Sequence, residues 1–435
     1  MTASQMMLFG GGVSAPALTG VFGGAYTSTS NGYFGRGTAI NNSGNIFCLG
    51  FNTTVGIAAI YRFTAAGAGR GSVTIGPTAS SSTISTGTGK PICVDSAGNH
   101  YVCFWNSVLA TGFRTAYLVK YNDSGVEQWK RQLTETANNA QAVNVCLDST
   151  AANVILTCIG QIGANTGSYV LSFTAAGALN WQRQLTGGSL TQALCCFTDA
   201  SNNVFVGGQS NQTGTFRGFL VKYNSAGTIQ WQRSIQDGAN QQSVASGAAD
   251  TAGNLYIAGS NSLMKLPAAG TTFTWQNQTP VDLLQTPNWI DVDVTSGDIV
   301  GFIFNGSNIS VVSRWTTAGA IVWANDLQAQ TGGNGVGLSF NRVANNIGWA
   351  GVGGSTSTAI NFSLPGDGTK LGTYTENLAI GGATTYFYNP RTLVFVSATS
   401  RTNVAGGLTD AAGTLTSATA TISSTVTTNV FSRAM

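Results

Sequence analysis

Phe173-Thr174-Ala175-Ala176-Gly177-Ala178-Leu179-Asn180-Trp181 is the stretch that decides the fold, because relatives of it recur along the chain. In each copy an extended segment leads into a tight turn built on Ala-Gly or a similar pair, and a second extended segment follows. The turn occurs eight times, and in five copies a Trp follows it four or five residues later. The turn glycines are Gly67, Gly125, Gly177, Gly227, Gly270, Gly319, Gly368 and Gly413. Such self-similarity indicates an array of one supersecondary unit.

The period of the array predicts the fold. Consecutive turn glycines lie between 43 and 58 residues apart. This spacing is too long for the short solenoid repeats and fits a propeller blade of four strands. We therefore expect an all-β chain, a β-propeller of eight four-stranded blades in which terminal strands close the ring. Seven blades with a terminal extension is the alternative, because the first and eighth units lack the Trp, as terminal units of an array often do.

The repeat also defines the expected domains. It runs over residues 34–421 without an interruption that resembles a linker, so this range is predicted to be one β-propeller domain. Residues 1–33 are expected to form an N-terminal arm rich in Gly, Ser and Thr, and residues 422–435 a C-terminal tail. Both segments could run across the domain or reach a neighbouring subunit. We expect them to become ordered on assembly.

Two side-chain patterns recur within the units. By the strand period of two, Leu179, Trp181, Arg183 and Leu185 should share one face, and the recurrence of this Trp favours packing toward a neighbouring blade. A second turn carries an Asp or Asn, whose side chain can accept hydrogen bonds from nearby backbone amides. It appears at Asn42–Asn45, Asp95–Asn99, Asp199–Asn203 and Asp250–Asn254. Most carboxylates of the chain are therefore predicted to be turn formers.

Composition limits the partners. Charged residues make up only 8% of the 435 residues, the net charge is +3, and the basic residues are spread along the chain. Nucleic acid is therefore not an expected partner. The chain lacks an apolar run of about 18 residues, so no membrane insertion is expected. The first nine residues lack the basic start and the long apolar core of a signal peptide.

The cysteines indicate a reducing environment during folding. They are seven in number and include no CxxC pair, and their neighbours are largely apolar. This pattern is typical of buried, reduced thiols and predicts folding in a cytoplasm. The seven are Cys48, Cys93, Cys103, Cys146, Cys158, Cys195 and Cys196.

Candidate catalytic groups are few. His100 is the only histidine and begins an apolar strand, so it is interpreted as a filler of the strand edge. Asp291 and Asp293 form the best carboxylate pair, because residues i and i+2 share a strand face. They could form half of a cation site or a glycosidase-like pair, but Asp293 also matches the Asp of the repeated turn. We therefore expect no catalytic residue, cofactor or metal site.

The Phe173–Trp181 pattern and its copies resemble the bacterial propeller repeats of the beta-propeller-repeat and pyrroloquinoline-quinone-like type. The resemblance covers nearly 390 residues and implies a propeller fold. It does not imply a function, because a fold hosts many functions. The quinone enzymes of that type carry cofactor and metal ligands that match no residues of this chain, so no site residue is transferred.

The wider composition resembles bacteriophage virion structural proteins, especially tail or appendage components. The resemblance rests on the richness in Gly, Ser, Thr, Asn and Ala, the scarcity of charge and the expected propeller. It implies a non-enzymatic virion protein of a tail, fibre or collar-like appendage, folded in the host cytoplasm. Its expected partners are other virion proteins and copies of itself.

The alternative is a propeller that binds cell-surface glycans, as an adhesin or lectin-like module. Its sugar platforms would be the tryptophans outside the repeated position, which are Trp105, Trp289, Trp315 and Trp349. The two interpretations overlap if the appendage attaches to a host glycan. A third, a quinone-dependent or hydrolytic enzyme, would depend on Asp291 or Asp293.

Overall fold

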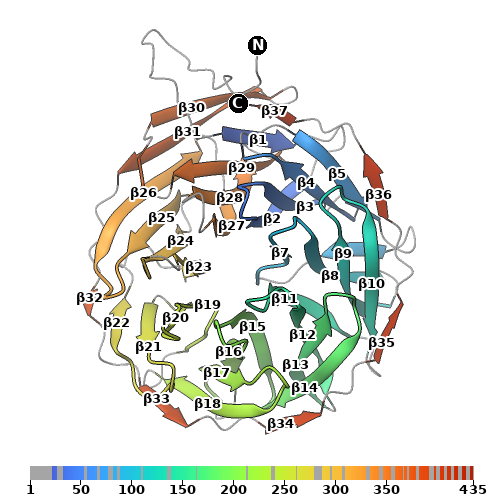
Figure 1. Ribbon diagram of the computed structural model, residues 1–435, viewed down its shortest axis with the longest axis vertical. Helices are drawn as coiled ribbons and strands as arrows, with labels where there is room; N and C mark the ends of the chain where they lie inside the picture. Colours follow the sequence, from blue (N-terminus) through green and yellow to red (C-terminus); the bar gives the residue numbers. More distant parts are fainter. Residues whose placement is uncertain are drawn as a thin grey trace.

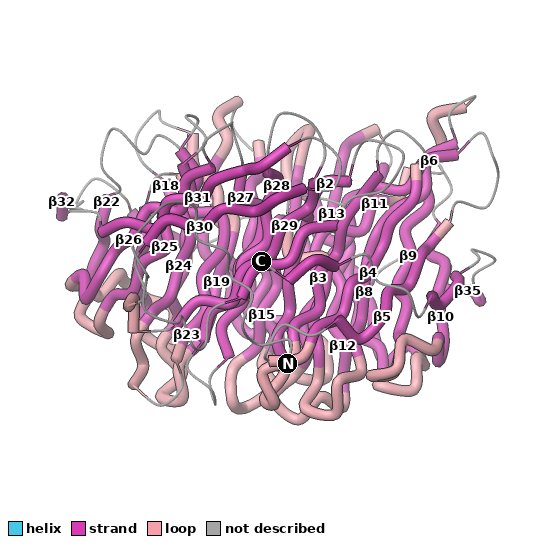
Figure 2. The backbone as a smooth tube through the Cα atoms, turned by 90° about the horizontal axis from the view of Figure 1, so that it is seen from above, coloured by secondary structure: helices cyan, strands magenta, loops and turns pink. Residues whose placement is uncertain are grey.

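The computed structural model is all-β over the residues it describes. These are residues 22–26, 33–52, 56–65, 69–76, 82–85, 89–108, 111–134, 139–162, 164–211, 214–236, 241–260, 262–278, 287–293, 296–305, 309–329, 334–341, 346–353, 358–365, 367–369, 372–378, 382–390, 396–397, 402–405, 409–412, 416–419, 424–427 and 432–434. Their strands form seven sheets, arranged around a centre as the blades of a β-propeller (Figure 1). Seen edge-on, the strands stand side by side and most described loops lie along one edge of the ring (Figure 2).

We number the blades along the chain and give their strands from the centre outward. Blade 1 holds β2 (Tyr33–Ile40), β3 (Ile46–Asn52), β4 (Ile57–Phe63), β5 (Gly69–Ile75) and β36 (Ser424–Thr427). Blade 2 holds β6 (Ser82–Ser85) and β7 (Ile92–Val94), which both pair with β8 (His100–Val108), then β9 (Arg114–Tyr121), β10 (Glu127–Thr134) and β35 (Thr416–Thr419). Blade 3 holds β11 (Gln141–Leu147), β12 (Asn153–Ile162), β13 (Asn165–Thr174), β14 (Leu179–Thr186) and β34 (Thr409–Ala412).

The remaining four blades follow the same plan. Blade 4 holds β15 (Thr191–Thr198), β16 (Val204–Ser210), β17 (Arg217–Tyr223), β18 (Ile229–Gln236) and β33 (Thr402–Ala405). Blade 5 holds β19 (Ser246–Ala249), β20 (Leu255–Gly259), β21 (Ser262–Leu266), β22 (Trp275–Gln278) and β32 (Val396–Ser397). Blade 6 holds β23 (Pro287–Val292), β24 (Ile299–Asn305), β25 (Ile309–Trp315), β26 (Ile321–Ala329), β31 (Gly382–Pro390) and β30 (Gly372–Leu378). Blade 7 holds β27 (Asn334–Asn341), β28 (Asn346–Gly353), β29 (Thr358–Pro365), β1 (Phe22–Tyr26) and β37 (Ser432–Ala434).

The expectation of eight four-stranded blades is wrong. The described strands form seven sheets, and each sheet has five or six strands. The supposed eighth unit around Gly413 is not a blade. Its Thr409–Ala412 segment is β34, which pairs with β14 on the outer edge of blade 3, and Gly413 itself lies outside the described residues. A short Thr-Asp-Ala-Ala strand before a glycine imitates the repeated turn without the rest of the unit.

Terminal segments complete blade 7. β1 pairs with β29 and takes the place of a fourth strand, and β37 pairs with the other edge of β1. A strand from each end of the chain therefore lies in the same sheet. Parts of the two segments expected as arms are thus strands of the propeller, namely β1 in residues 1–33 and β36 and β37 in residues 422–435.

The C-terminal segment forms a belt around the outside of the ring. We use this name for β31 to β37, which join the outer sides of blades 6, 5, 4, 3, 2, 1 and 7 in turn (Figure 1). In blade 6, β30 pairs with β31 and lies outside it. Each belt strand is antiparallel to the blade strand it joins. The belt passes the blades in the reverse of their order along the chain. It covers backbone groups that an open sheet edge would leave unpaired.

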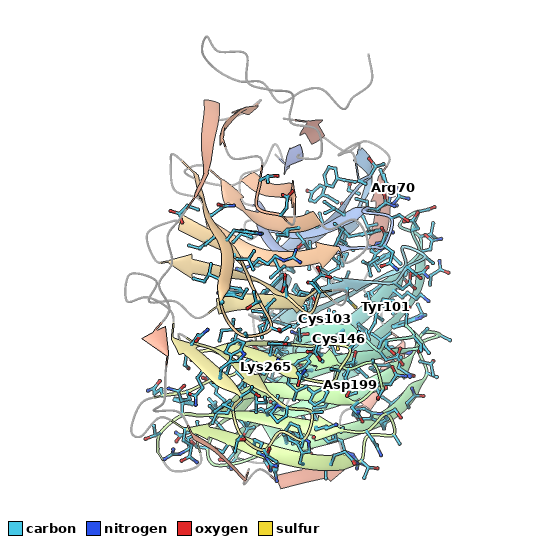
Figure 3. All side chains as sticks on the ribbon, turned by 60° about the vertical axis from the view of Figure 1, so that its left-hand side comes forward. Arg70, Tyr101, Cys103, Cys146, Asp199 and Lys265 are labelled. Atoms are coloured by element: carbon cyan, nitrogen blue, oxygen red, sulfur yellow. The ribbon has the colours of Figure 1, made fainter. Side chains whose placement is uncertain are left out.

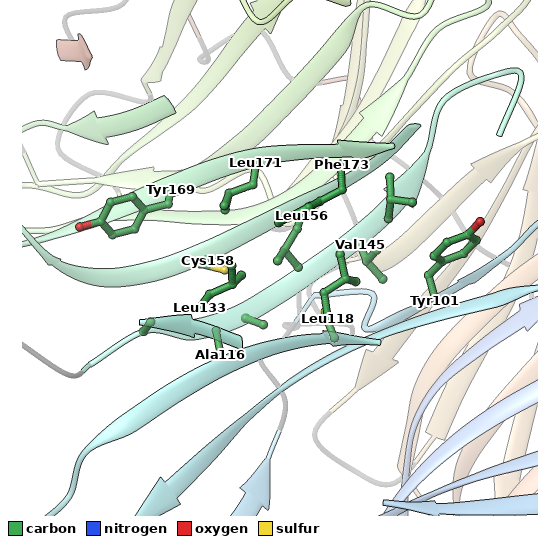
Figure 4. Packing of buried hydrophobic residues seen from close by; sticks show 14 of the residues in the cluster. Tyr101, Ala116, Leu118, Leu133, Val145, Leu156, Cys158, Tyr169, Leu171 and Phe173 are labelled. Atoms are coloured by element: carbon green, nitrogen blue, oxygen red, sulfur yellow. The ribbon is translucent and has the colours of Figure 1, made fainter. Parts of the chain in front are cut away.

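The hydrophobic core lies between neighbouring blades. The cluster in Figure 4 joins Leu118 and Leu133 of blade 2 to Leu156, Leu171 and Phe173 of blade 3, all with no exposed surface. Similar clusters join blades 1 and 2, 3 and 4, 4 and 5, and 5 and 6. Apolar side chains on both faces of a blade therefore have a partner, which explains the near-continuous apolar runs of the central strands.

The repeated Trp fastens one blade to the next, as the sequence predicted. Trp181 Nε1 of blade 3 donates to the Ser225 carbonyl oxygen of blade 4 at 2.9 Å, and Arg183 Nε donates to the Gly227 carbonyl oxygen at 2.6 Å. Gly227 has φ 76°, and a Cβ placed on it would lie 2.5 Å from Trp181 Cδ2. Only glycine suits this turn, because both its φ and the indole exclude a side chain. We call this set of contacts the Trp latch.

The prediction that Leu179 shares a face of β14 with Trp181 is wrong. The pairing of β13 with β14 skips Asn180, because Ser172 pairs with Trp181 and Phe173 with Leu179. This β-bulge turns Leu179 away from the Trp face and leaves it 39% exposed.

Within the described part of the chain, no helix is long and apolar enough to cross a membrane.

Candidate functional site

The centre of the ring encloses a channel of about 570 Å³ between the innermost strands of blades 1 to 6. At one end it is bordered by the turns that join the first and second strands of the blades, at Asp95, Asp148, Asp199 and Asp250. Figure 3 shows Cys146 and Asp199 of this lining toward the middle of the molecule. This channel is the candidate functional site, because it brings together thiols and carboxylates from several blades.

The carboxylates at the channel mouth are turn formers, as predicted. Asp199 Oδ1 accepts from the Asn203 backbone amide at 2.9 Å, and its Oδ2 accepts from Asn203 Nδ2 at 2.7 Å. Asp95 and Asp250 make the same two contacts with the Asn four residues later. Charge-assisted hydrogen bonds of this kind stabilise a buried carboxylate without a metal or a basic side chain. These aspartates hold the loops in shape and do not converge on one point of the channel.

Asp291 and Asp293, the candidate carboxylate pair, make different contacts. Asp291 lines the channel, and its Oδ1 accepts from the Val292 backbone amide at 2.9 Å. Asp293 is 7% exposed and forms an ion pair with Arg314, with Oδ2 2.7 Å from Nη2. Arg314 also reaches Asp298 at 2.9 Å. The carboxylate of Asp293 is therefore occupied by an ion pair in the turn between β23 and β24. This weakens the glycosidase-like interpretation, which needs two carboxylates free to act on a substrate.

His100 lies inside the contact between blades 1 and 2. It has no exposed surface, its ring stacks on Tyr121 at 5.5 Å between centroids, and Phe47 lies on the other side at 4.8 Å. Burial lowers the pKa of His100 to about 4, and the Gly98 carbonyl oxygen, 3.2 Å from Nδ1, opposes this shift. The neutral ring packs as a core side chain. Its interpretation as a structural filler matches this environment.

The channel is also lined by thiols. Cys93, Cys146, Cys195 and Cys196 contribute to its wall from blades 2, 3 and 4. All seven cysteines are free, and six are buried. Burial raises the pKa of Cys195 to about 12 and raises the pKa of Cys93 and Cys196 well above the ordinary thiol value. Within the described residues, no group of three or more His, Cys, Asp or Glu side chains is placed to hold a metal ion.

Two of the four tryptophans of the glycan alternative are buried. Trp289 is 4% exposed and Trp315 is 1% exposed, and Trp315 belongs to the core cluster between blades 5 and 6. Trp105 is half-buried on β8. Trp349 lies on β28, and its side chain is outside the described part of the structure. Two of the four rings therefore have almost no surface on which a sugar could stack.

Sequence reasoning missed the convergence of the thiols. It treated Cys93, Cys146 and Cys196 as separate core residues, whereas the ring places them on one channel wall. Each lies on the innermost strand of its unit, shortly before the Asp turn. Cys93 and Cys146 precede Asp95 and Asp148 by two residues. Cys196 precedes Asp199 by three residues. That recurrence was the available signal.

No family model matches the chain. No curated protein matches it either. Among solved structures, it is similar to the β-propeller domain of the Trilobed protease from Pyrococcus furiosus, with 6% identity over 77% of this chain and 94% of that one and a TM-score of 0.44. It is also similar to Sqt1 from Chaetomium thermophilum, with 10% identity, 77% and 98% coverage and a TM-score of 0.40. A third is a protein of unknown function from Bacteroides caccae, with 14% identity, 59% and 93% coverage and a TM-score of 0.35.

Proposed function

We propose that this β-propeller is a non-enzymatic structural protein of a bacteriophage virion, in a tail, fibre or collar-like appendage. It acts through contacts with other virion proteins and with copies of itself. The observation that carries the proposal is the belt, which adds an outer strand to every blade and joins a strand of each chain end in one sheet. A ring fastened at its circumference suits a part that bears mechanical load.

The use of the polar residues supports the same proposal. Asp95, Asp199 and Asp250 stabilise turns, Asp293 pairs with Arg314, and His100 is buried between aromatic rings. These groups are engaged in holding the fold. An 8% content of charged residues also limits the long-range repulsion between copies packed at high local concentration.

Electron microscopy tests the proposal directly. An antibody raised against the recombinant chain, followed by a gold-labelled secondary antibody, is applied to purified phage particles from the source culture. We expect label at one defined position of the particle, with pre-immune serum as the control. Label confined to soluble or cell-surface fractions, with none on particles, would overturn the proposal.

A further inference from the structure

Three neighbouring blades each place a thiol on the same wall of the central channel. Cys93 lies on β7 of blade 2, Cys146 on β11 of blade 3 and Cys196 on β15 of blade 4. The strands β7, β11 and β15 are the innermost strands of their blades, so all three cysteines line the channel.

Cys146 and Cys196 share the core cluster between blades 3 and 4, whereas Cys93 belongs to the cluster between blades 2 and 3. Cys196 Sγ points across the boundary to blade 3, where it lies 3.3 Å from Asn144 Oδ1 and 3.7 Å from the Ile155 carbonyl oxygen. Cys146 follows Asn144 by two residues on β11, so it lies on the same strand face. Cys146 packs against the same cluster as Cys196 at the boundary between blades 3 and 4.

The adjacent cysteine points elsewhere. Cys195 Sγ lies 3.7 Å from the Val244 carbonyl oxygen and belongs to the core cluster between blades 4 and 5. Cys196 belongs to the cluster between blades 3 and 4, with Cys146 packed against it. Cys195 therefore provides a matched control for any chemistry of the Cys146 and Cys196 pair.

Access to the pair is uneven. Cys146 is half-buried and lines the channel, whereas Cys196 is 6% exposed. A small reagent that enters the channel would reach Cys146 first. Cys196 would then be in position to attack a mixed disulfide formed on Cys146. This is the arrangement of an attacking and a resolving thiol.

We propose that Cys146 and Cys196 form a redox-active pair that closes a disulfide between blades 3 and 4 when the protein meets a small-molecule disulfide of the glutathione class. The Cys146 thiolate attacks one sulfur of the reagent, which forms a mixed disulfide and releases one thiol. Cys196 gives up its proton to solvent and attacks the Cys146 sulfur, which releases the second thiol. The two protein thiols lose two electrons and two protons in total, and the reagent is reduced to two thiols.

The disulfide would be a covalent staple between two blades that are otherwise held by packing and by the Trp latch. It would close a loop of about 50 residues, and cross-links over long loops restrict the unfolded chain most. All seven cysteines are free thiols in the structure, so the staple is absent from this reduced state. This inference does not depend on the proposed function.

Peptide mapping of the full chain tests the proposal. The native protein is incubated with glutathione disulfide, quenched with acid and N-ethylmaleimide, digested with trypsin and analysed by mass spectrometry. Cys146 and Cys158 lie between Arg131 and Arg183, and Cys195 and Cys196 lie between Arg183 and Arg217. The two tryptic peptides should be joined by one disulfide, and fragment ions should assign it to Cys146 and Cys196.

Four variants separate the possible pairings. The cross-link should disappear in Cys146→Ala and Cys196→Ala and persist in the matched controls Cys158→Ala and Cys195→Ala. Oxidised wild-type protein should also melt several degrees higher than reduced protein, and dithiothreitol should reverse this shift. Absence of the cross-link in the native wild type, its appearance only after denaturation, or a link from Cys146 to Cys93 would overturn the proposal. The wild-type fragment ions decide the question even if a variant fails to fold.

Discussion

Both pairs of blades share an apolar core, but the outer turn is held by charges between blades 1 and 2 and by an indole between blades 3 and 4. At the first, Arg62 Nη1 donates to the Asp123 carbonyl oxygen at 2.6 Å, and Arg70 forms an ion pair with the Asp123 carboxylate. At the second, Trp181 lies against Gly227 and Arg183 bonds its carbonyl oxygen. Both contacts fasten an outer strand to the same Ala-Gly type of turn in the next blade.

Other blade contacts extend the comparison. Blade 5 keeps the Trp but replaces Arg with Asn277, whose Nδ2 donates to the Gly319 carbonyl oxygen at 2.7 Å. Asn325 makes the equivalent bond to Gly368 at 2.9 Å. In each of these hydrogen bonds the acceptor is a carbonyl oxygen of the turn, while the donor side chain differs between blades. The backbone of the turn is thus the conserved element of the geometry, and the side chain that meets it can be aromatic, basic or amide. Charged contacts should respond to pH and salt, and aromatic ones should not.

The largest effect is expected from Gly227→Val. Valine would have to adopt φ near 76°, and its Cβ would collide with Trp181, so strain and overpacking add. We expect a loss of about 4 kcal/mol in the free energy of unfolding. Urea denaturation followed by circular dichroism measures it. Gly214→Val is the control, because Gly214 has φ 80° but no atom within 4 Å of its Cβ position. Equal losses at both sites would show that the indole contact is unimportant.

Trp181→Ala should follow, with a loss of about 3 kcal/mol, because it removes both the packing and the indole hydrogen bond. Trp181→Phe should recover part of the loss by restoring the ring without the donor. The same urea titration compares the two variants. If both cost the same, the hydrogen bond to Ser225 outweighs the packing.

Acid should lower the free energy of unfolding by about 2 kcal/mol between pH 7 and pH 4.5, because His100 is buried next to the charged contact between blades 1 and 2. His100 is neutral in the fold, because burial lowers its pKa to about 4; the charges of Arg62 and Arg70 lower this pKa and that of Asp123 raises it. Since its pKa is depressed from 6.5, the unfolded chain binds the proton first, and stability is lost as pH falls from about 6.5 toward 4. Urea titrations at several pH values measure this slope. His100→Phe should flatten it, and an unchanged slope in that variant would assign the acid sensitivity to other groups.

The smallest effect is expected from Asp123→Asn. The Arg70 hydrogen bond lowers the pKa of Asp123, so its contribution is present at neutral pH and is lost as pH falls below its ordinary value of 3.8. Because Asp123 is 35% exposed, water screens the pair, and we expect a loss of at most about 1 kcal/mol at low salt. Melting in 0.02 M and 1 M sodium chloride should show wild type approaching the variant at high salt. A salt-independent difference would contradict an ionic contribution.

The propeller class and the role of the repeated turn could be predicted from the sequence because both are local. The residues that form the hairpin at Gly177 and the Trp that follows it are neighbours in sequence, so the hairpin can be recognised locally. Repetition of this unit predicts a propeller. The belt could not be predicted in this way. Its strands are two to nine residues long and pair with blade strands that are far away in sequence. The bulge at Asn180 could not be predicted either, because the alternation of side chains along a strand does not show where an extra residue is inserted.

The candidate site was predicted less well than the fold. The turn role of Asp199 and the packing role of His100 follow from neighbours in sequence. The meeting of Cys146 with Cys196 depends on the rotation from one blade to the next, which a strand pattern does not contain. Trp289 and Trp315 were considered as exposed platforms because they fall outside the repeat, yet they are buried.

The reverse course of the belt has a consequence for biosynthesis. β36 pairs with β5, so the outer edge of blade 1 stays open until Ser424–Thr427 has left the ribosome. The blades can form one after another during translation, but their edges are covered only afterwards, by a segment that starts at blade 6 and travels backward. A chain released before residue 396 would expose six blade edges at once. Synthesis of the belt is thus also the step that protects the protein from edge-to-edge aggregation.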